Sequence, residues 1–358
     1  MENFIKNLEI SHFKSIKDLK LDCKRVNVFI GKPNVGKSNI LEALGLLGVY
    51  FMDDNRDFLS KNMFRYETIA DLFFDKNIVK QAVVSCEYGA GILRNVKNDE
   101  YELISGPAAV VKKILDGEEI TDILEHEFVE HVSKSVKSNK ISFDSNGKII
   151  GSPLFGTTGI DVQRYIFKQI EEVIGTKQPT LLASMGLNLF DIVLRNKVLQ
   201  EEIGRKLAEY GLSFVLSQSP SKFLIQKKEN DFFAIQYPYS SIADTLQRFI
   251  FYLAAVESNT NSVLIFEEPE VHSFPPYVKE LAERMILKDD NQYFVSTHSP
   301  YLLQTFIDSL DHAELNVYLT YYRNYQTHVK ALSAEELRDI QDFGYDVFFN
   351  LRKFEPNE

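Results

Sequence analysis

The sequence contains little of what disulfide-rich, zinc-binding or collagen-like proteins require. Among 358 residues there are two cysteines, Cys23 and Cys86, too few for a secreted disulfide framework or a four-cysteine zinc site. Seventeen glycines and eleven prolines are too few for a collagen-like or low-complexity chain. The composition, 44% hydrophobic and 25% charged, is that of a globular protein, and the length predicts about two structural units.

Targeting and membrane-spanning patterns are also missing. The first residues include Glu2, Lys6 and Glu9 and no apolar stretch, so we expect no signal peptide. The longest uncharged stretch near the N-terminus, Ala43 to Met52, is far too short to span a membrane. We therefore expect a soluble, cytoplasmic protein with no membrane partner. Acidic residues outnumber basic ones by 51 to 40, and the net charge of −11 argues against coating nucleic acid by bulk charge while leaving a local basic groove open.

Strand and helix patterns alternate at both ends of the chain. Apolar and polar periodicity predicts strands over residues 4–10, 16–21, 25–30, 262–266, 292–296, 315–321 and 329–332 and helices over 39–48, 243–257 and 278–286. Ser333 followed by Glu336 is a capping-box signature for a terminal helix. This alternation implies an α/β core whose sheet is completed by distant segments.

The middle of the chain is less regular. We expect a short strand over residues 81–88, a loop over 147–159 and a helix over 161–174. The predicted organisation is therefore an N-terminal part of the core at residues 1–49, an inserted α+β region at 50–235 and a C-terminal part of the core at 236–358. The inserted region is the expected site of partner or trigger recognition.

The strongest motif is GKPNVGKS, residues 31–38, a full G-x-x-x-x-G-K-[ST] match between a predicted buried strand and a predicted helix. Glycines let backbone N–H groups point at a phosphate, and the helix N-terminus adds a favourable dipole. Lys37 supplies positive charge for the β- and γ-phosphates, and Ser38 offers a hydroxyl to Mg²⁺. A chance glycine-rich turn is the alternative, which the flanking strand and helix disfavour. The expected nucleotide-binding residues are Gly31, Asn34, Gly36, Lys37, Ser38 and Asn39.

Two further strands end in polar groups. SVLIFEEPE, residues 262–270, places Glu267 and Glu268 at the carboxyl end of a strand, where α/β sheets bind ligands. One carboxylate can hold Mg²⁺ and its neighbour can act as a general base, although a solvated acidic turn is the plainer interpretation. FVSTHSP, residues 294–300, places His298 thirty residues after Glu268 at the tip of the next strand. A lone histidine is more often structural, but this position favours a functional role.

Together, GKPNVGKSN, LIFEEPEVH and FVSTHSP resemble the Walker A, Walker B with D-loop, and switch-histidine motifs of ABC-type ATPases. The likeness is to the SMC/RecF-like branch and the OLD-like ATPases, especially compact ATPases of bacterial phage-defence and toxin operons. It implies a P-loop NTPase fold of ABC type with a mixed sheet and an α+β insertion between Walker A and the signature segment. It also implies that Glu267 serves Mg²⁺, Glu268 is the general base and His298 senses the γ-phosphate. The opening ISHFKSI resembles the first strand of that branch, where residues such as Lys14 and Ser15 lie near the nucleotide.

The chain departs from that pattern at the signature segment. The matching region is YSSIADTLQR, residues 239–248, in which Ser240 or Ser241 can supply the hydroxyl that contacts the partner's γ-phosphate, but the usual glycine is missing. The family also more often has Asp where this chain has Glu267. Both departures bear on the rate of turnover and leave ATP binding unaffected.

Several functions remain open from the sequence. The first is an ATP- and Mg²⁺-dependent switch, a homodimer or higher homo-oligomer formed through an ATP sandwich, that controls a separate effector in anti-phage defence. The second is a RecF-like, DNA-binding ATPase of repair or maintenance, and the third is an ATP-binding scaffold that hardly turns over. Only sixty residues follow His298, without an Asp-x-Asp, so we expect no Toprim nuclease domain in this chain.

Overall fold

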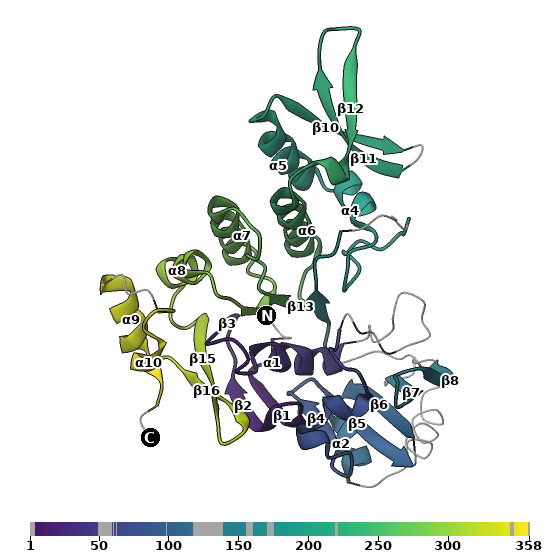
Figure 1. The fold of residues 1–358 in the computed structure, drawn as a ribbon, viewed down its shortest axis with the longest axis vertical. Helices are drawn as coiled ribbons and strands as arrows, with labels where there is room; N and C mark the ends of the chain where they lie inside the picture. Colours follow the sequence, from purple (N-terminus) through teal and green to yellow (C-terminus); the bar gives the residue numbers. More distant parts are fainter. Residues whose placement is uncertain are drawn as a thin grey trace.

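The computed structural model describes residues 4–48, 59, 61, 63–97, 99–116, 139–154, 160–169, 175–218, 221–343 and 347–356. Two large sheets lie on either side of helix α1 (Lys37–Leu44), and a smaller lobe stands at one end of the molecule (Figure 1). The first and last parts of the chain share the central sheet, as the alternating strand and helix patterns predicted.

The central sheet has six strands in the order β16-β15-β3-β14-β13-β9. Neighbouring strands are parallel except for the β15–β16 hairpin, so the sheet is mixed and the expected α/β class is confirmed. The strands are β3 (Val26–Ile30), β9 (Val162–Tyr165), β13 (Val263–Glu267), β14 (Gln292–Ser296), β15 (Leu315–Arg323) and β16 (Gln326–Ala331).

The central strands are buried on both faces because apolar side chains occupy successive positions. Phe29, Ile265 and Phe294 point to the face that packs against α1 and the second sheet. The residues next to them along each strand pack against helices α6 (Asp244–Ser258), α7 (Pro275–Leu287) and α8 (Pro300–Ser309) on the opposite face. A continuous apolar run of this kind is typical of a parallel sheet covered on both sides. Helices α1 and α6 therefore lie on opposite faces of the central sheet.

The second sheet is antiparallel, with seven strands in the order β2-β1-β4-β5-β6-β7-β8. Its strands are β1 (Asn7–Phe13), β2 (Ile16–Asp22), β4 (Ala82–Ser85), β5 (Gly89–Lys97), β6 (Glu100–Pro107), β7 (Asn139–Asp144) and β8 (Ile149–Leu154). One face packs on α1, where Leu8 and Ile10 join Ile40 and Leu41 in a single apolar core. Helix α2 (Ala108–Leu115) covers β5 and β6 with Val111 and Ile114.

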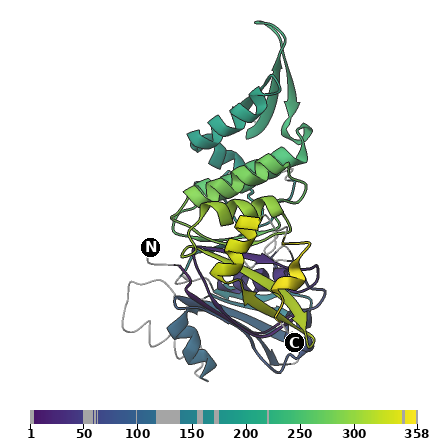
Figure 2. The same ribbon diagram turned by 90° about the vertical axis from the view of Figure 1, so that its left-hand side faces the viewer.

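The lobe is formed by α4 (Leu189–Arg195), α5 (Lys197–Ala208) and a three-stranded sheet of β10 (Leu212–Gln218), β11 (Ser221–Lys228) and β12 (Ala234–Pro238). A 3₁₀ turn, η4 (Tyr239–Ser241), then leads into α6. Figures 1 and 2 both show the β11–β12 hairpin at one end of the molecule, pointing away from the two larger sheets. The lobe is thus joined to the core chiefly through the start of α6 and the chain that follows β9.

Two expectations for the middle of the chain were wrong. Residues 162–165 of the expected helix form strand β9, because both faces of this segment are buried and its backbone pairs with β13. Residues 166–169 are not helical either, and 170–174 lie outside the described residues. Part of the expected loop at 147–159 is strand β8, and residues 155–159 are not described.

The expected boundaries at residues 50 and 235 also cut through both large sheets. Strands β4 to β8 extend the sheet begun by β1 and β2, and β9 forms one edge of the central sheet. The segment from residue 175 to η4 is the part that forms a separate lobe.

The C-terminal elements follow the prediction closely. The Ser333 amide donates to Glu336 Oε2 (2.8 Å) and the Glu336 amide donates to Ser333 Oγ (3.1 Å), which is the capping box at the start of α9 (Ala334–Phe343). Helix α10 (Leu351–Phe354) follows. Across the described part of the chain, no helix combines the length and apolar character that crossing a membrane requires.

Candidate nucleotide site

The loop between β3 and α1 has the backbone of a phosphate-binding loop. Gly31 and Gly36 have φ values of 146° and 102°, and Asn34 has φ 60°. A Cβ on Gly31 would lie 2.2 Å from the Thr320 carbonyl oxygen, and one on Gly36 would lie 2.0 Å from Thr327 Oγ1. Both positions therefore require glycine. The loop feeds directly into α1, whose first N–H groups have no partner within the helix and can face a phosphate.

Lys37 is held against this loop. Its Nζ donates hydrogen bonds to the carbonyl oxygens of Gly31 and Lys32, both at 3.0 Å. Burial lowers the pKa of Lys37, while the carboxylates of Glu268 and Glu267 oppose that shift. The ammonium group is thus fixed at the phosphate loop, with acidic residues nearby.

Ser38 and Glu267 lie side by side, one at the start of α1 and the other at the carboxyl end of β13. The Ser38 hydroxyl hydrogen-bonds the Glu267 carboxylate. Burial works against ionisation of Glu267, but the charge of Arg164, the Ser38 hydrogen bond and the charge of Arg65 together lower its pKa below the usual range. An ionised carboxylate beside a hydroxyl is a pair of hard oxygen donors, which fits Mg²⁺. Ser38 and Glu267 are the residues that would hold the ion, and its chemistry there would be to neutralise phosphate charge.

Glu268 and His298 form a second pair at the same edge of the sheet. Glu268 has φ 45°, and its amide donates to the Ser296 carbonyl (3.0 Å), which turns the chain sharply after β13. Its Oε1 lies 3.4 Å from His298 Nε2. Burial, and then the charge of Lys37, lower the pKa of His298 although Glu268 opposes them. The imidazole is therefore neutral near pH 7.

A carboxylate that the sequence motifs did not single out fixes the position of His298. Glu270 accepts hydrogen bonds from Thr297 Oγ1 (2.8 Å) and from the His298 amide (2.7 Å). Burial raises the pKa of Glu270 despite these hydrogen bonds. Glu270 thus ties the turn after β13 to the turn after β14.

The turn between β1 and β2 reaches the phosphate loop through hydroxyl and amide contacts. Asn39 Nδ2 donates to Ser15 Oγ (2.7 Å), and Ser15 Oγ lies 2.6 Å from Thr327 Oγ1. Thr327 Oγ1 in turn donates to the Val35 carbonyl (2.9 Å). Two of the expected nucleotide-site segments, the first-strand segment with Ser15 and the Walker A segment with Val35 and Asn39, therefore meet at one point.

An ion-pair network beside this point was not predicted. The side chain of Glu42 is fully buried in α1 and pairs with Lys14 and, at 2.7 Å, with Arg65. Arg65 also contacts Glu267 at 3.1 Å, and Arg164 reaches the same carboxylate. Burial lowers the pKa of Lys14, with Glu42 acting in the opposite direction. The sequence did contain a signal for Glu42, because it is a charged residue within an otherwise apolar helix. Nothing in the sequence linked Arg65 or Arg164 to the site.

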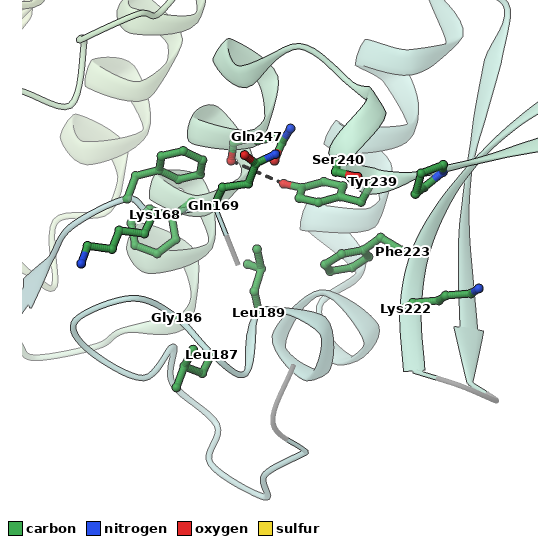
Figure 3. A pocket seen from close by; sticks show the side chains of 13 residues that line it. Lys168, Gln169, Gly186, Leu187, Leu189, Lys222, Phe223, Tyr239, Ser240 and Gln247 are labelled. Atoms are coloured by element: carbon green, nitrogen blue, oxygen red, sulfur yellow. Dashed lines mark hydrogen bonds between the residues drawn. The ribbon is translucent and has the colours of Figure 1, made fainter. Parts of the chain in front are cut away.

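The two signature serines lie elsewhere. Ser240 and Ser241 form the exposed 3₁₀ turn before α6, on the face of the central sheet opposite α1. Ser240 lines a cavity of about 390 Å³ in the lobe, together with Phe223 and Tyr239 (Figure 3). Within one chain, the structure brings together the Walker A, Walker B, switch-histidine and first-strand residues, and it leaves these two serines outside that group.

These features define a P-loop nucleotide-binding protein of the α/β class. A family profile described as an AAA ATPase domain matches residues 4–233, more than half of the chain, and the chain belongs to that family. Among the curated proteins no match was found.

Solved structures with similar folds include three SMC head domains. A head bound to the C-terminal winged-helix domain of ScpA aligns with a TM-score of 0.48 and 17% identity, covering 94% of this chain and 100% of that one. The head from Thermotoga maritima gives a TM-score of 0.42 and 13% identity over 92% and 99% of the two chains. A Pyrococcus furiosus head with an extended coiled coil, bound to the C-terminal domain of ScpA, gives 0.46 and 14% over 95% and 99%.

Proposed function

We propose that this chain hydrolyses ATP with Mg²⁺ and that the nucleotide controls the association of two copies. The observation that carries the proposal is the convergence of Lys37, Ser38, Glu267, Glu268 and His298 at the carboxyl ends of β3, β13 and β14. Adjacent strands of a parallel sheet present their carboxyl ends at one edge, which is where α/β proteins bind ligands. The motif resemblance to SMC/RecF-like and OLD-like ABC ATPases agrees with this assignment.

Each residue has a separate task in the proposed reaction. The backbone amides of the loop and the Lys37 ammonium bind the phosphates, and Ser38 and Glu267 hold Mg²⁺. The positive φ of Glu268 turns the chain so that its carboxylate lies next to His298. This carboxylate accepts a proton from the attacking water. The neutral His298 imidazole hydrogen-bonds the γ-phosphate. Glu270 is a positioning residue, because it accepts a hydrogen bond from the His298 backbone amide.

The location of Ser240 and Ser241 supports the dimer. They are exposed and lie on the opposite face of the central sheet from α1, so a second chain is the natural source of these hydroxyls for each nucleotide. The ATP-bound state would then be a homodimer, or a higher homo-oligomer, held together by ATP. Binding energy that favours the closed assembly makes the protein a nucleotide-gated switch.

The output we propose is control of a separate effector protein in bacterial anti-phage defence, in the cytoplasm. This step depends on the motif resemblance to compact defence ATPases. Duplex DNA as the partner is the competing outcome. A fluorescence-anisotropy titration with duplex DNA, with and without ATP, distinguishes the two, because a DNA clamp would bind tightly only with nucleotide and lose affinity steeply with added salt.

The test of the switch is the solution mass of Glu268→Gln by light scattering, with and without ATP and Mg²⁺. This variant should bind ATP without cleaving it and so accumulate the closed assembly, giving a rise in mass on addition of ATP. The double variant Lys37→Ala, Glu268→Gln is the matched control and should show no ATP-dependent change. A mass that is independent of ATP in both variants would refute nucleotide gating.

A further inference from the structure

The turn that carries His298 is fixed chiefly at its backbone. Glu270 accepts a hydrogen bond from the His298 amide (2.7 Å), which holds the peptide group and leaves the imidazole free to rotate about its two side-chain torsions. The Glu268 carboxylate lies 3.4 Å from Nε2, which is longer than an ordinary hydrogen bond. The His298 side chain is 37% exposed, so the core does not enclose it. One orientation of the ring therefore requires a further contact.

The C-terminal segment provides that contact. The centroid of the Phe348 ring lies 6.1 Å from the centroid of the His298 imidazole, and the two planes are tilted by 41°. Aromatic rings attract one another at centroid distances of about 4.5–7 Å, in preferred relative orientations. Phe348 is itself half-buried against the apolar core to which α8 and α9 contribute. The imidazole thus meets Glu268 at Nε2 and Phe348 at its ring.

Residues close to Phe348 in the sequence are anchored in the same core. Val347, Leu351 and Phe354 are buried members of the apolar cluster that includes residues of α8. The Asn350 amide donates to the Val347 carbonyl (3.0 Å), which closes the turn that leads from Phe348 into α10. The backbone that carries Phe348 is therefore fixed, and its ring can limit the rotation of a neighbouring side chain.

The end of the segment is tied to the phosphate loop. Glu355 pairs with Lys32 of that loop at 2.8 Å, and Arg323 at the end of β15 donates to the Pro356 carbonyl (3.0 Å). Figure 1 shows α10 beside β15 and β16. Residues 347–356 therefore connect the switch histidine with the loop that binds phosphate.

We propose that Phe348 is a positioning residue for ATP hydrolysis, which holds the His298 imidazole with Nε2 beside Glu268 and toward the γ-phosphate. This inference rests on the proposed function, because it assigns the contact that orients one residue of that reaction. An interaction that keeps a group in its reactive orientation raises kcat without strengthening the binding of the substrate. Phe348 touches the imidazole, so its loss should change the rate of hydrolysis and leave ATP affinity unaffected.

Steady-state hydrolysis and calorimetric ATP binding test this separation. Phe348→Ala should lower kcat by about tenfold to a hundredfold, since a misplacement of about 1 Å can cost about a hundredfold in rate. The ATP dissociation constant should stay the same. Phe348→Tyr keeps an aromatic ring at this position and should restore most of the rate.

The neighbouring residue offers a matched control. Phe349 has the same side chain and is 90% exposed, so Phe349→Ala should retain the full rate. An unchanged kcat in Phe348→Ala, equal losses in Phe348→Ala and Phe349→Ala, or a parallel loss of ATP affinity would overturn the proposal.

NMR of the apo protein labelled with ¹³C-histidine tests the contact without hydrolysis. Among the described residues, the charged groups around the imidazole are Lys37 at the start of α1, Glu268 after β13 and Glu270 at the backbone amide. Phe348 contributes an uncharged ring that keeps water from part of the imidazole. Burial is the main cause of the lowered pKa of His298, so this pKa should rise toward about 6.5 in Phe348→Ala and stay unchanged in Phe349→Ala.

The two measurements distinguish failure of this inference from failure of the proposed function. His298→Gln identifies the His298 signal by its loss from the spectrum. An unchanged pKa of His298 in Phe348→Ala would refute the contact, whatever the rate of hydrolysis. Absence of hydrolysis by the unmodified chain would instead refute the proposed ATPase, and with it a role for Phe348 in turnover.

Discussion

Arg164 Nη2 lies 2.5 Å from Glu267 Oε2, although the two residues are 103 positions apart in the sequence. Arg164 is on the edge strand β9 with a side chain only 2% exposed, and Glu267 ends the neighbouring strand β13. A cation within the central sheet therefore compensates the carboxylate that we expect to serve Mg²⁺. This ion pair makes the stability of the apo protein depend on a residue of the nucleotide site.

Loss of Glu267 should destabilise the protein more than a typical surface change would. Glu267→Ala leaves the buried Arg164 without a compensating charge, so we expect the free energy of unfolding to fall by about 3 kcal/mol. Arg164→Met should cost less, because Arg65 still contacts Glu267 at 3.1 Å. Urea denaturation of both single variants and the double variant, without nucleotide or Mg²⁺, measures the coupling. Strictly additive losses would contradict a direct Arg164–Glu267 interaction.

Replacement of Lys37 should abolish nucleotide binding. Lys37→Ala removes the only ammonium group that the structure fixes to the Gly31 and Lys32 carbonyls, counting described residues alone. Isothermal titration calorimetry with ATP and Mg²⁺ should detect no binding. Lys32→Ala is the matched control, because the Lys32 ammonium pairs with Glu355 at 2.8 Å on the surface. The ATP affinity of this variant should stay near that of the unmodified chain. Unchanged ATP affinity in Lys37→Ala would contradict the P-loop assignment.

Glu268→Gln should lower kcat for ATP hydrolysis by about 10²–10⁴-fold while ATP affinity is retained, since it removes a general base without removing a phosphate ligand. A phosphate-release assay measures the rate. Glu283→Gln, at a half-exposed position on α7, is the control and should leave the rate unchanged. Indistinguishable, near-zero rates for the unmodified chain and Glu268→Gln would favour an ATP-binding scaffold over an ATPase.

His298 should make stability depend on pH in a defined direction. Burial and Lys37 lower its pKa in the folded protein, so the unfolded chain, with the usual value of about 6.5, binds the proton more tightly. Between the folded pKa and about 6.5 the unfolded state carries more protons, and the free energy of unfolding rises with pH through that window. Chemical denaturation at closely spaced pH values should show this slope, and His298→Gln should reduce it. An identical slope in the variant would mean that His298 does not titrate as described.

Glu270 should affect turnover through the position of His298. Glu270→Ala removes the acceptor for the Thr297 hydroxyl and the His298 amide, so kcat should fall while ATP affinity stays the same. Glu270→Gln keeps an oxygen that can accept both hydrogen bonds and should restore part of the rate. Steady-state kinetics on the two variants provide the comparison, and equal losses of both activity and ATP affinity would point to a general structural role.

The core of the nucleotide site follows from the sequence because its motifs are local. Gly31, Lys37 and Ser38 belong to one loop, and the conformation of that loop depends on residue types within it. Glu267 and His298 each end a continuous apolar strand, and the position of such strand ends is fixed by the parallel sheet. Short-range patterns were therefore sufficient for these residues.

The charged partners of the site could not be read in the same way. Arg65 and Arg164 reach Glu267 across 202 and 103 positions, and such distant pairing leaves no spacing signal in a single sequence. Strand β9 was misassigned as helix for a related reason. Val162–Tyr165 is short, and its strand conformation comes from pairing with β13 about a hundred residues later.

Strand β9 also limits how the molecule can be taken apart. Excising residues 50–235 as a cassette would remove an edge strand of the central sheet, five of the seven strands of the second sheet and the partner of Glu267. A chimera that exchanges only residues 175–238, ahead of η4, would leave both large sheets intact and would keep Ser240 and Ser241. That stretch is the unit that can be exchanged between homologous proteins. Such an exchange would change what the β11–β12 hairpin contacts and would retain the residues of the candidate nucleotide site.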